Sequence, residues 1–168
     1  PFFLEGGSQY CFGRGEVLEK YSLDSRLFLI ILKNPKVSLS TSEIYKKYSD
    51  KFQVNYLSSE IEYEVKRNNL RSIDFSYDNF INRRINIRND LQKIVQSENK
   101  SVIDALNLFS QIEECICFSM SGSGPSCYGL FYDYEIAKKV YEENKKLFFG
   151  FGFDSWLCQF QSNGIKIL

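Results

Sequence analysis

The chain contains no histidine in its 168 residues. Imidazole is the usual base that activates a serine or cysteine nucleophile, and it is a common zinc ligand. The five cysteines, Cys11, Cys115, Cys117, Cys127 and Cys158, show no C-x-x-C spacing. A Ser-His or Cys-His pair therefore cannot be assembled from this chain alone. The usual zinc and haem sites are also disfavoured, so we predict no metal ligands.

An excess of positive charge is also missing, because 21 Lys and Arg residues are balanced by 21 Asp and Glu. Proteins that bind nucleic-acid phosphates usually carry a basic surface, so we expect no nucleic-acid partner. Long apolar runs are absent too: LFLIIL, at residues 27–32, is far shorter than the roughly 20 residues that cross a bilayer. No signal peptide precedes this run, and we expect an intracellular protein without a membrane partner.

What the chain does contain is a composition typical of globular domains, with 43% apolar and 25% charged residues. This is enough for one substantial core, or for one domain and part of another. The sequence gives no indication of the oligomeric state.

Hydrophobic periodicity and turn residues predict a mixed order of strands and helices. Ser40 and Glu43 have the spacing of a capping box, so a helix should begin near Thr41. Residues 53–79 are polar and weakly periodic, and we expect a surface excursion without a site. The expected elements are strands at 2–5, 9–12, 17–21, 27–32, 115–120, 127–132 and 154–161, and helices from 41 onward, at 80–95, at 101–112 and at 134–147, the last capped by Asp133.

From residue 27 onward this order predicts an α+β fold close to the ferredoxin-like arrangement, an antiparallel sheet with helices packed on one face. The glycine-rich loop should join the two middle strands. Cys115 and Cys117 should share one face of their strand. They could form a reactive thiol pair, but we expect buried, inert core residues, because that is the role of most cysteines outside disulfides.

The loop SGSGPS, at residues 121–126, is ambiguous when taken alone. It lacks the GxxxxGKS/T pattern of a P-loop, and a strand rather than a helix follows it. Its glycines permit positive φ angles and leave backbone N–H groups uncovered, as in an anion-binding nest. A simple turn and a phosphate-binding loop both remain open on this pattern.

Four segments, in order along the chain, resemble motifs of the GHMP kinases, the small-molecule kinases named for galactokinase, homoserine kinase, mevalonate kinase and phosphomevalonate kinase. MSGSGPSCYGLF resembles their third motif. PFFLEGG with GRGE, the P-x-x-x-x-S-T-x-x-x-Y spacing of residues 35–45, and the NDL at 89–91 resemble one branch, which acts on 4-diphosphocytidyl-2-C-methyl-D-erythritol. GRGE and the ST-x-x-x-Y segment separate this branch from homoserine and mevalonate kinases.

The resemblance implies a fold and a domain division. Residues 1–26 would be the last hairpins of the N-terminal domain, which is ribosomal-protein-S5-like. Residues 27–168 would be the ferredoxin-like C-terminal GHMP kinase domain.

The resemblance also implies a reaction, in which ATP, with Mg²⁺, phosphorylates the 2-hydroxyl of the cytidine substrate in non-mevalonate isoprenoid (terpenoid) biosynthesis. The compartment would be the bacterial cytoplasm or the plastid stroma. In the family the base is an aspartate with one residue between it and the equivalent of Pro1, and the partner lysine and the ATP phosphate loop lie further upstream. We therefore expect no catalytic residue in this chain and no kinase activity from it alone.

The resemblance assigns substrate-side roles to two residues of the helix that begins near Thr41. Tyr45 matches the aromatic residue that stacks on the cytosine ring, although a core-facing position beside Tyr48 is the alternative. Thr41 matches the residue that opens the same helix, where its hydroxyl could simply cap.

The glycine-rich loop matches the third motif through Ser121, Gly122, Ser123, Gly124 and Pro125. In the family this loop packs beside the ATP phosphate loop, so we expect it to support phosphate binding without being the main cradle.

Two charged residues near the motifs have a functional and a structural interpretation. Arg14 could pair with a phosphate or simply face solvent in a hairpin. Asp90 could serve the chemistry, but a capping or salt-bridge role is the better prediction.

Two other functions remain open. The protein could be another GHMP kinase that acts on a different alcohol. It could also be a non-catalytic GHMP-like or ferredoxin-like module that binds a ligand or partner.

Overall fold

The structure is a computed structural model that describes residues 5–21, 27–53, 56–74, 78–79 and 87–160. The strand expected at 2–5 lies almost wholly outside these ranges. None of the helices in the described part of the chain is long and apolar enough to span a membrane.

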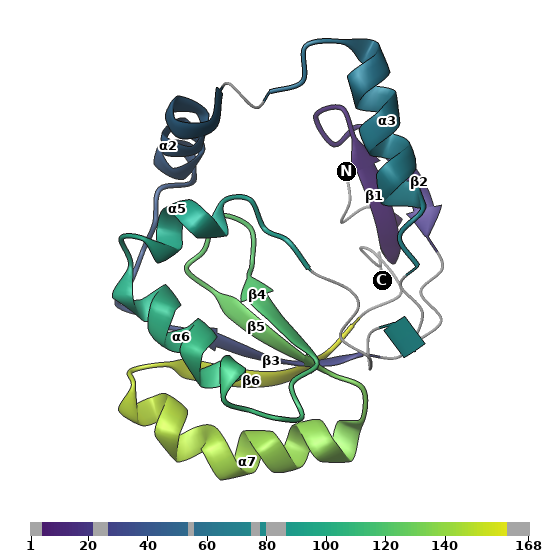
Figure 1. The fold of residues 1–168 in the computed structure, drawn as a ribbon. Coiled ribbons are helices and arrows are strands. Elements are labelled where there is room, and N and C mark those ends of the chain that lie inside the picture. The colour runs from purple at the N-terminus through teal and green to yellow at the C-terminus, as the bar shows by residue number, and fades with distance from the viewer. Residues whose placement is uncertain (1–4, 22–26, 54–55, 75–77, 80–86, 161–168) are drawn as a thin grey trace, which may run out of the picture.

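Four antiparallel strands form the main sheet (Figure 1). They are β3 (Phe28–Lys33), β4 (Cys117–Met120), β5 (Cys127–Phe131) and β6 (Asp154–Gln159), in the order β4-β5-β3-β6. This is the ferredoxin-like order, as predicted. The glycine-rich loop joins β4 and β5, the two middle strands in chain order, as predicted. In the sheet itself β4 lies at the edge, because β5 pairs with β3 on its other side.

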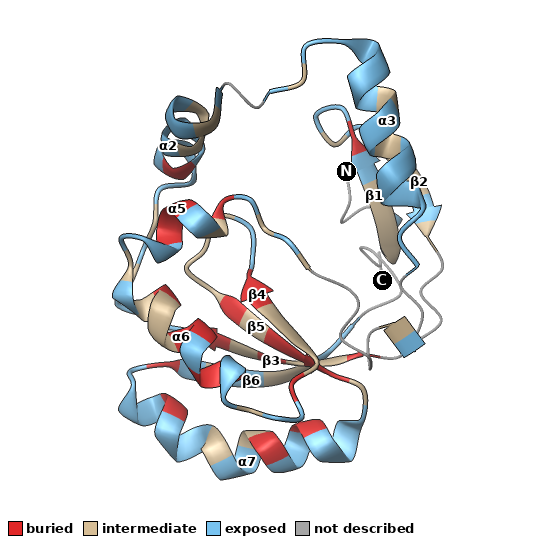
Figure 2. Cartoon of the chain, viewed as in Figure 1, coloured by how far each residue is buried: buried red, intermediate tan, exposed pale blue. Residues whose placement is uncertain are grey.

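The core lies between one face of this sheet and the helices α6 (Lys100–Ser110) and α7 (Tyr134–Gly150). Side chains alternate along each strand, so Ile30 and Leu32 of β3 point to the helices and are fully buried. The rings of Phe109 in α6 and Phe148 in α7 meet with centroids 6.4 Å apart. Figure 2 shows the buried residues of both helices on their sheet-facing sides.

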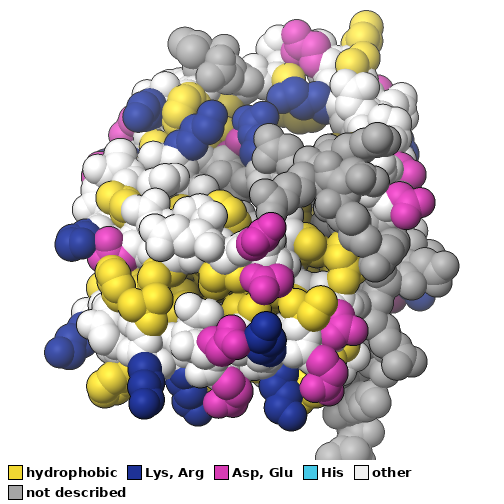
Figure 3. Space-filling model, turned by 60° about the horizontal axis from the view of Figure 1, so that its bottom comes forward, with side chains coloured by type: hydrophobic (Ala, Val, Ile, Leu, Met, Phe, Trp, Pro, Cys, Tyr) yellow, Lys and Arg dark blue, Asp and Glu magenta, His cyan; other side chains and the backbone are white. Residues whose placement is uncertain are grey.

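The outer surface of α7 is solvated, as expected of an amphipathic helix. Ala137, Val140 and Phe148 are its buried residues. Figure 3, in which the bottom of Figure 1 comes forward, shows basic and acidic side chains beside each other along this surface. Asp133 caps the helix as predicted, because its carboxylate accepts from the N–H of Ile136 at 3.0 Å.

A glycine in β5 lets α6 approach the sheet. A Cβ added to Gly129 would lie 2.5 Å from a ring carbon of Phe109 and 2.9 Å from the sulfur of Cys115. Only a hydrogen fits between the strand and these two side chains, so the close helix–sheet packing depends on this residue.

Cys115 and Cys117 lie on opposite faces of the sheet. Cys115 belongs to the core beneath the helices, whereas Cys117 packs with Leu27 and Leu130 on the other face. The shared face was predicted wrongly, because β4 begins only at Cys117 and the two-residue repeat does not extend to Cys115. Of the two thiols predicted to be buried in the core, Cys115 is buried and Cys117 is half-buried. Burial raises the pKa of Cys117 to about 12, which keeps its thiol protonated at neutral pH.

The helices that precede α6 in the chain follow the prediction to different degrees. The helix α2 (Thr41–Phe52) begins as predicted, and the Ser40 hydroxyl accepts from the N–H of Glu43. The helix expected at 80–95 is reduced to α5 (Gln92–Gln96) in the described chain; residues 87–91 are not helical, and 80–86 lie outside the described ranges. The amide oxygen of Asn89 accepts from the N–H of Leu91 at 3.0 Å, a local turn that competes with helix formation.

The hairpin of β1 (Ser8–Phe12) and β2 (Val17–Tyr21) forms its own two-stranded sheet, as predicted. Arg14 lies in its exposed turn. Residues 53–79, predicted as a surface excursion without a site, contain the helix α3 (Glu60–Arg71), which was not predicted. Its periodicity was weak because none of its residues is buried, but Ser59 and Glu62 form a complete capping box.

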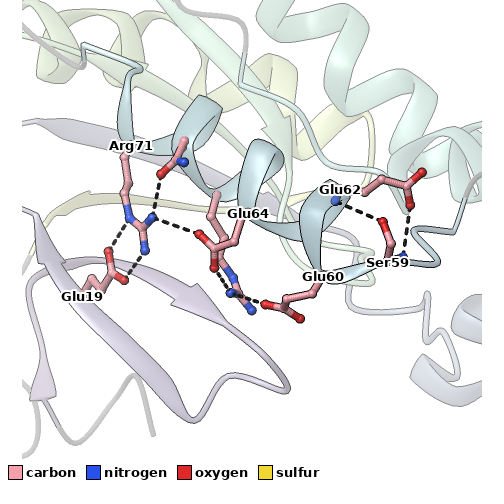
Figure 4. Close-up of polar contacts among 8 residues, drawn as sticks. Glu19, Ser59, Glu60, Glu62, Glu64 and Arg71 are labelled. Carbon is pink, nitrogen blue, oxygen red and sulfur yellow. Dashed lines mark hydrogen bonds and ion pairs between the residues drawn. The ribbon is translucent and has the colours of Figure 1, made fainter.

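Ionic contacts hold α3 against the hairpin (Figure 4). The guanidinium of Arg71 donates to both carboxylate oxygens of Glu19, at 2.8 and 2.6 Å. Arg67 contacts Glu60 and Glu64 within the helix. Both arginines also lie over the ring of Phe12, at 5.8 and 5.2 Å from its centroid.

Candidate functional site

A cleft of about 540 Å³ opens where α2, the segment before α5 and the glycine-rich loop meet. This is within the size range of small-molecule sites. Its lining residues are Tyr45, Tyr48, Ile87, Arg88, Asn89, Asp90, Leu91, Met120, Ser121, Gly122 and Tyr128.

Helix α2 contributes the first aromatic wall. Tyr45 is 58% exposed, whereas Ile44 beside it is buried and anchors the helix to the core. The alternative of a core-facing Tyr45 is therefore wrong, and its ring is available to a ligand. Tyr48, one turn on, is half-buried. Its burial, reinforced by the charge of Asp90, raises the pKa of its phenol.

Tyr128 of β5 contributes a second aromatic wall from the sheet. Burial raises its pKa to about 12, so the phenol is neutral at physiological pH. Arg88 and Asp90, on the segment before α5, form an ion pair with each other, as the salt-bridge interpretation of Asp90 predicted. The cleft thus combines aromatic surface with the positive charge of Arg88, which the carboxylate of Asp90 partly neutralises.

The glycine-rich loop closes the cleft from the sheet side. Gly122 and Gly124 have φ angles of +54° and +80°, which non-glycine residues rarely adopt. Within the loop, the N–H of Gly124 donates to the carbonyl of Ser121 at 2.9 Å. Among the hydrogen bonds of the described residues, none uses the N–H of Gly122 or Ser123 as donor. These two groups at the loop tip can therefore serve a bound anion.

Two side-chain amides fasten the loop and the end of β4. Asn89 donates to the carbonyls of Met120 and Gly122, at 2.7 and 2.8 Å. The amide oxygen of Gln92 accepts from the hydroxyl of Ser119 at 2.9 Å and from the N–H of Met120 at 2.8 Å. At the tip, the hydroxyls of Ser123 and Thr41 are hydrogen-bonded at 2.8 Å.

The predicted site residues thus converge on one region, but not all of them face the cleft. Tyr45, Ser121 and Gly122 line it. Thr41 and Ser123 contact each other at its edge, and neither is among the lining residues; nor are Gly124 and Pro125.

Sequence reasoning missed three residues of this region: Asn89, Gln92 and Tyr128. Asn89 was noticed only as part of NDL. Neither hydrophobic periodicity nor charge distinguishes a residue whose role is to bond distant backbone groups.

The comparisons with known proteins concern this same region. Residues 78–149, which include the segment before α5 and the glycine-rich loop, match the family model described as GHMP kinases C terminal. Three cyanobacterial relatives, from Prochlorococcus marinus strains MED4, AS9601 and MIT 9312, are 48%, 51% and 51% identical over all 168 residues. Each is named 4-diphosphocytidyl-2-C-methyl-D-erythritol kinase. The chain is therefore similar to the C-terminal part of the GHMP kinases.

The fold of a solved GHMP kinase agrees with this assignment. Homoserine kinase from Cytophaga hutchinsonii superposes with a TM-score of 0.67, at 18% identity, over 96% of this chain and 50% of the other. The antiparallel sheet with helices on one face is thus the GHMP C-terminal architecture. The chain spans about half the length of its curated relatives, 54% for the three named above.

Proposed function

We propose that the complete protein containing this chain transfers the γ-phosphoryl group of ATP to the 2-hydroxyl of 4-diphosphocytidyl-2-C-methyl-D-erythritol, a step in isoprenoid biosynthesis. The proposal is supported by the names of relatives that are 48–51% identical along the whole chain. The structural observation that carries it is the meeting of Tyr45 with Ser121 and Gly122 in one cleft.

The chemistry of the cleft fits two parts of this substrate, the cytosine base and the diphosphate. An exposed tyrosine ring offers a flat surface on which a cytosine base can stack. The loop brings small side chains and backbone N–H groups to the same space, which suits the diphosphate. In this arrangement Tyr45 orients the nucleoside, while the loop holds the diphosphate and so positions the 2-hydroxyl that lies beyond it. Such positioning is the larger part of phosphoryl-transfer catalysis.

The base and the main ATP loop are assigned to the N-terminal part of the protein, in keeping with the family resemblance. We therefore propose that this chain alone does not turn over, and that its role is to hold and orient the substrate. Mg²⁺ would enter with ATP. Among the described residues, no group of three or more Cys, Asp or Glu side chains could hold a metal ion, so no step is assigned to Mg²⁺ on this chain.

Two further assignments are part of the proposal. Residues 1–26 would complete the N-terminal domain, and 27–168 would form the C-terminal one. The separate two-stranded sheet of β1 and β2 supports this division, although α3 of the second part contacts the hairpin. The bacterial relatives support action in a bacterial cytoplasm or, by extension, a plastid stroma.

The test is a kinase assay of the complete protein encoded by the gene that contains this chain. With ATP, Mg²⁺ and the cytidine substrate, phosphorus NMR should show a new phosphomonoester, and the 168-residue chain should give none. Homoserine and mevalonate should remain unphosphorylated. Turnover of another alcohol but not of the cytidine substrate would favour a different GHMP kinase. Binding of cytidine nucleotides without any turnover would favour a non-catalytic module.

A further inference from the structure

Asn89 bonds to three backbone groups at the cleft through one side chain. Its amide nitrogen donates to the carbonyl of Met120 at 2.7 Å and to that of Gly122 at 2.8 Å. Its amide oxygen accepts from the N–H of Leu91 at 3.0 Å. The last bond orients the side chain, and the first two cross 31 and 33 residues of sequence to reach the end of β4 and the loop.

These bonds fix the direction of peptide groups in the loop. A peptide unit is planar, with its C=O and N–H pointing opposite ways, so holding the Gly122 carbonyl also fixes the N–H of Ser123. The bond also engages a carbonyl oxygen whose partial negative charge would otherwise be free to repel a phosphate. Because residue 122 is a glycine, its backbone could adopt several orientations, and the bond restrains it to the positive φ that is observed.

We propose that Asn89 is a positioning residue of the phosphoryl-transfer site, which holds the glycine-rich loop in the orientation that receives the substrate's diphosphate. This inference rests on the proposed function. If Asn89 has this role, activity depends on the two N–H donors of its amide and not on the size or polarity of the side chain.

The chain offers a closely matched control in Asn144, on α7 and not among the cleft residues. Asn89→Asp keeps the shape and the acceptor for Leu91 but replaces the donor of two bonds with an oxygen that repels both carbonyls. Asn144→Asp makes the same amide-to-carboxylate change. It also removes a donor to a backbone carbonyl, that of Val140 at 2.9 Å, away from the loop.

The experiment compares kcat and KM of the complete protein carrying each substitution. Asn89→Asp should lower kcat by up to roughly 100-fold, the size of effect expected when reacting groups are misplaced by about 1 Å. KM for the cytidine substrate should change little, because Tyr45 holds the base. Asn144→Asp should stay near wild type in both. An unchanged kcat in Asn89→Asp, or an equal fall in Asn144→Asp, would overturn the proposal.

A second variant and a second readout separate positioning from folding. If Asn89→Asp is unfolded at the assay temperature, Asn89→Ala removes the donors without adding charge and is held to the same kcat criterion. The N–H of Gly124 is bonded to the Ser121 carbonyl within the loop, and its backbone amide exchange should also be faster in either Asn89 variant than in Asn144→Asp. An inactive wild-type protein would refute the proposed function, whereas unchanged Gly124 exchange would refute the role of Asn89.

Discussion

The hydroxyl oxygens of Thr41 and Ser123 lie 2.8 Å apart, although 82 residues separate them in the chain. The bond joins the first residue of α2, the helix that presents Tyr45 one turn later, to the tip of the glycine-rich loop. It therefore links the aromatic side of the cleft to the phosphate side. This contact gives Thr41 a structural role next to the substrate role that the sequence predicts for it.

Replacing Thr41 with valine tests this link, because valine has the same shape but no hydroxyl. The free energy of unfolding should fall by about 1 kcal/mol or less, since the bond is exposed and a typical net hydrogen bond contributes about that much. Activity of the complete protein should fall as well. Thr41→Ser keeps the hydroxyl and should restore both. Urea unfolding measures the stability of each variant, and a kinase assay of the complete protein measures its kcat. If Thr41→Val and Thr41→Ser had the same stability and the same kcat, the bond would contribute to neither.

The ferredoxin-like order was predictable because its signals are local. The run at 27–32, the strand-like segments around the glycine-rich loop and the Asp133 cap each leave a pattern within a few residues. Strand pairing then has few solutions for such an order. The position of β4 at the sheet edge, by contrast, leaves no pattern in the nearby sequence. It depends on β5 pairing with β3, across about 100 residues of chain.

The candidate site was only partly predictable, for a related reason. Tyr45 and the glycine-rich loop belong to short motifs, and the structure brings them to one cleft. Asn89 carries no such signal, because its three partners are backbone atoms that only the folded chain brings together. Helix α3 was missed because a helix held by ion pairs buries no apolar face, and periodicity detects only such faces.

Substituting Tyr45 with leucine should weaken binding of cytidine nucleotides by the complete protein. Stacking of a base on an aromatic ring contributes about 1–3 kcal/mol, so Kd for cytidine 5′-diphosphate should rise by roughly 5- to 150-fold. Tyr45→Phe keeps the ring and should bind almost normally. Tyr56→Leu is the matched control, because Tyr56 is 52% exposed and is not among the cleft residues. Isothermal titration calorimetry measures Kd for each variant. Equal affinities of the Tyr45→Leu and Tyr56→Leu variants would show that Tyr45 does not belong to the site.

The docking of α3 on the hairpin should depend on pH through Glu19. Its hydrogen bonds from Arg71 hold its carboxyl pKa below the ordinary value of 4.5. A lowered pKa in the folded state means that the pair stabilises the contact above pH 4.5 and is lost as the pH falls through the lowered pKa. At neutral pH, Arg71→Gln should therefore speed amide exchange in α3, and in strong acid the variant and wild type should converge.

Two further variants separate the bidentate contact from simple charge. Arg71→Lys keeps the charge without the two-pronged geometry and should give an intermediate rate of exchange. Lys139→Gln removes a more exposed helical cation, whose nitrogen is 4.0 Å from Glu143, and should leave α3 unchanged. Added salt should reduce the difference between Arg71→Gln and wild type. A difference that persists in strong acid would show that Glu19 is not the partner that matters.

Gly129→Ala should destabilise the chain, because the new methyl group would lie 2.5 Å from Phe109 and 2.9 Å from Cys115, both buried. Overpacking of this kind costs about 1–3 kcal/mol, because strand and helix must move apart. Gly150→Ala, at the end of α7, introduces the same methyl group where no atom lies within 4 Å, and alanine favours helix more than glycine does, so its stability should be unchanged or higher. Urea unfolding of both variants measures the difference directly. If Gly129→Ala were as stable as Gly150→Ala, α6 would pack less tightly on β5 than the structure indicates, and the core would not depend on a glycine at that position.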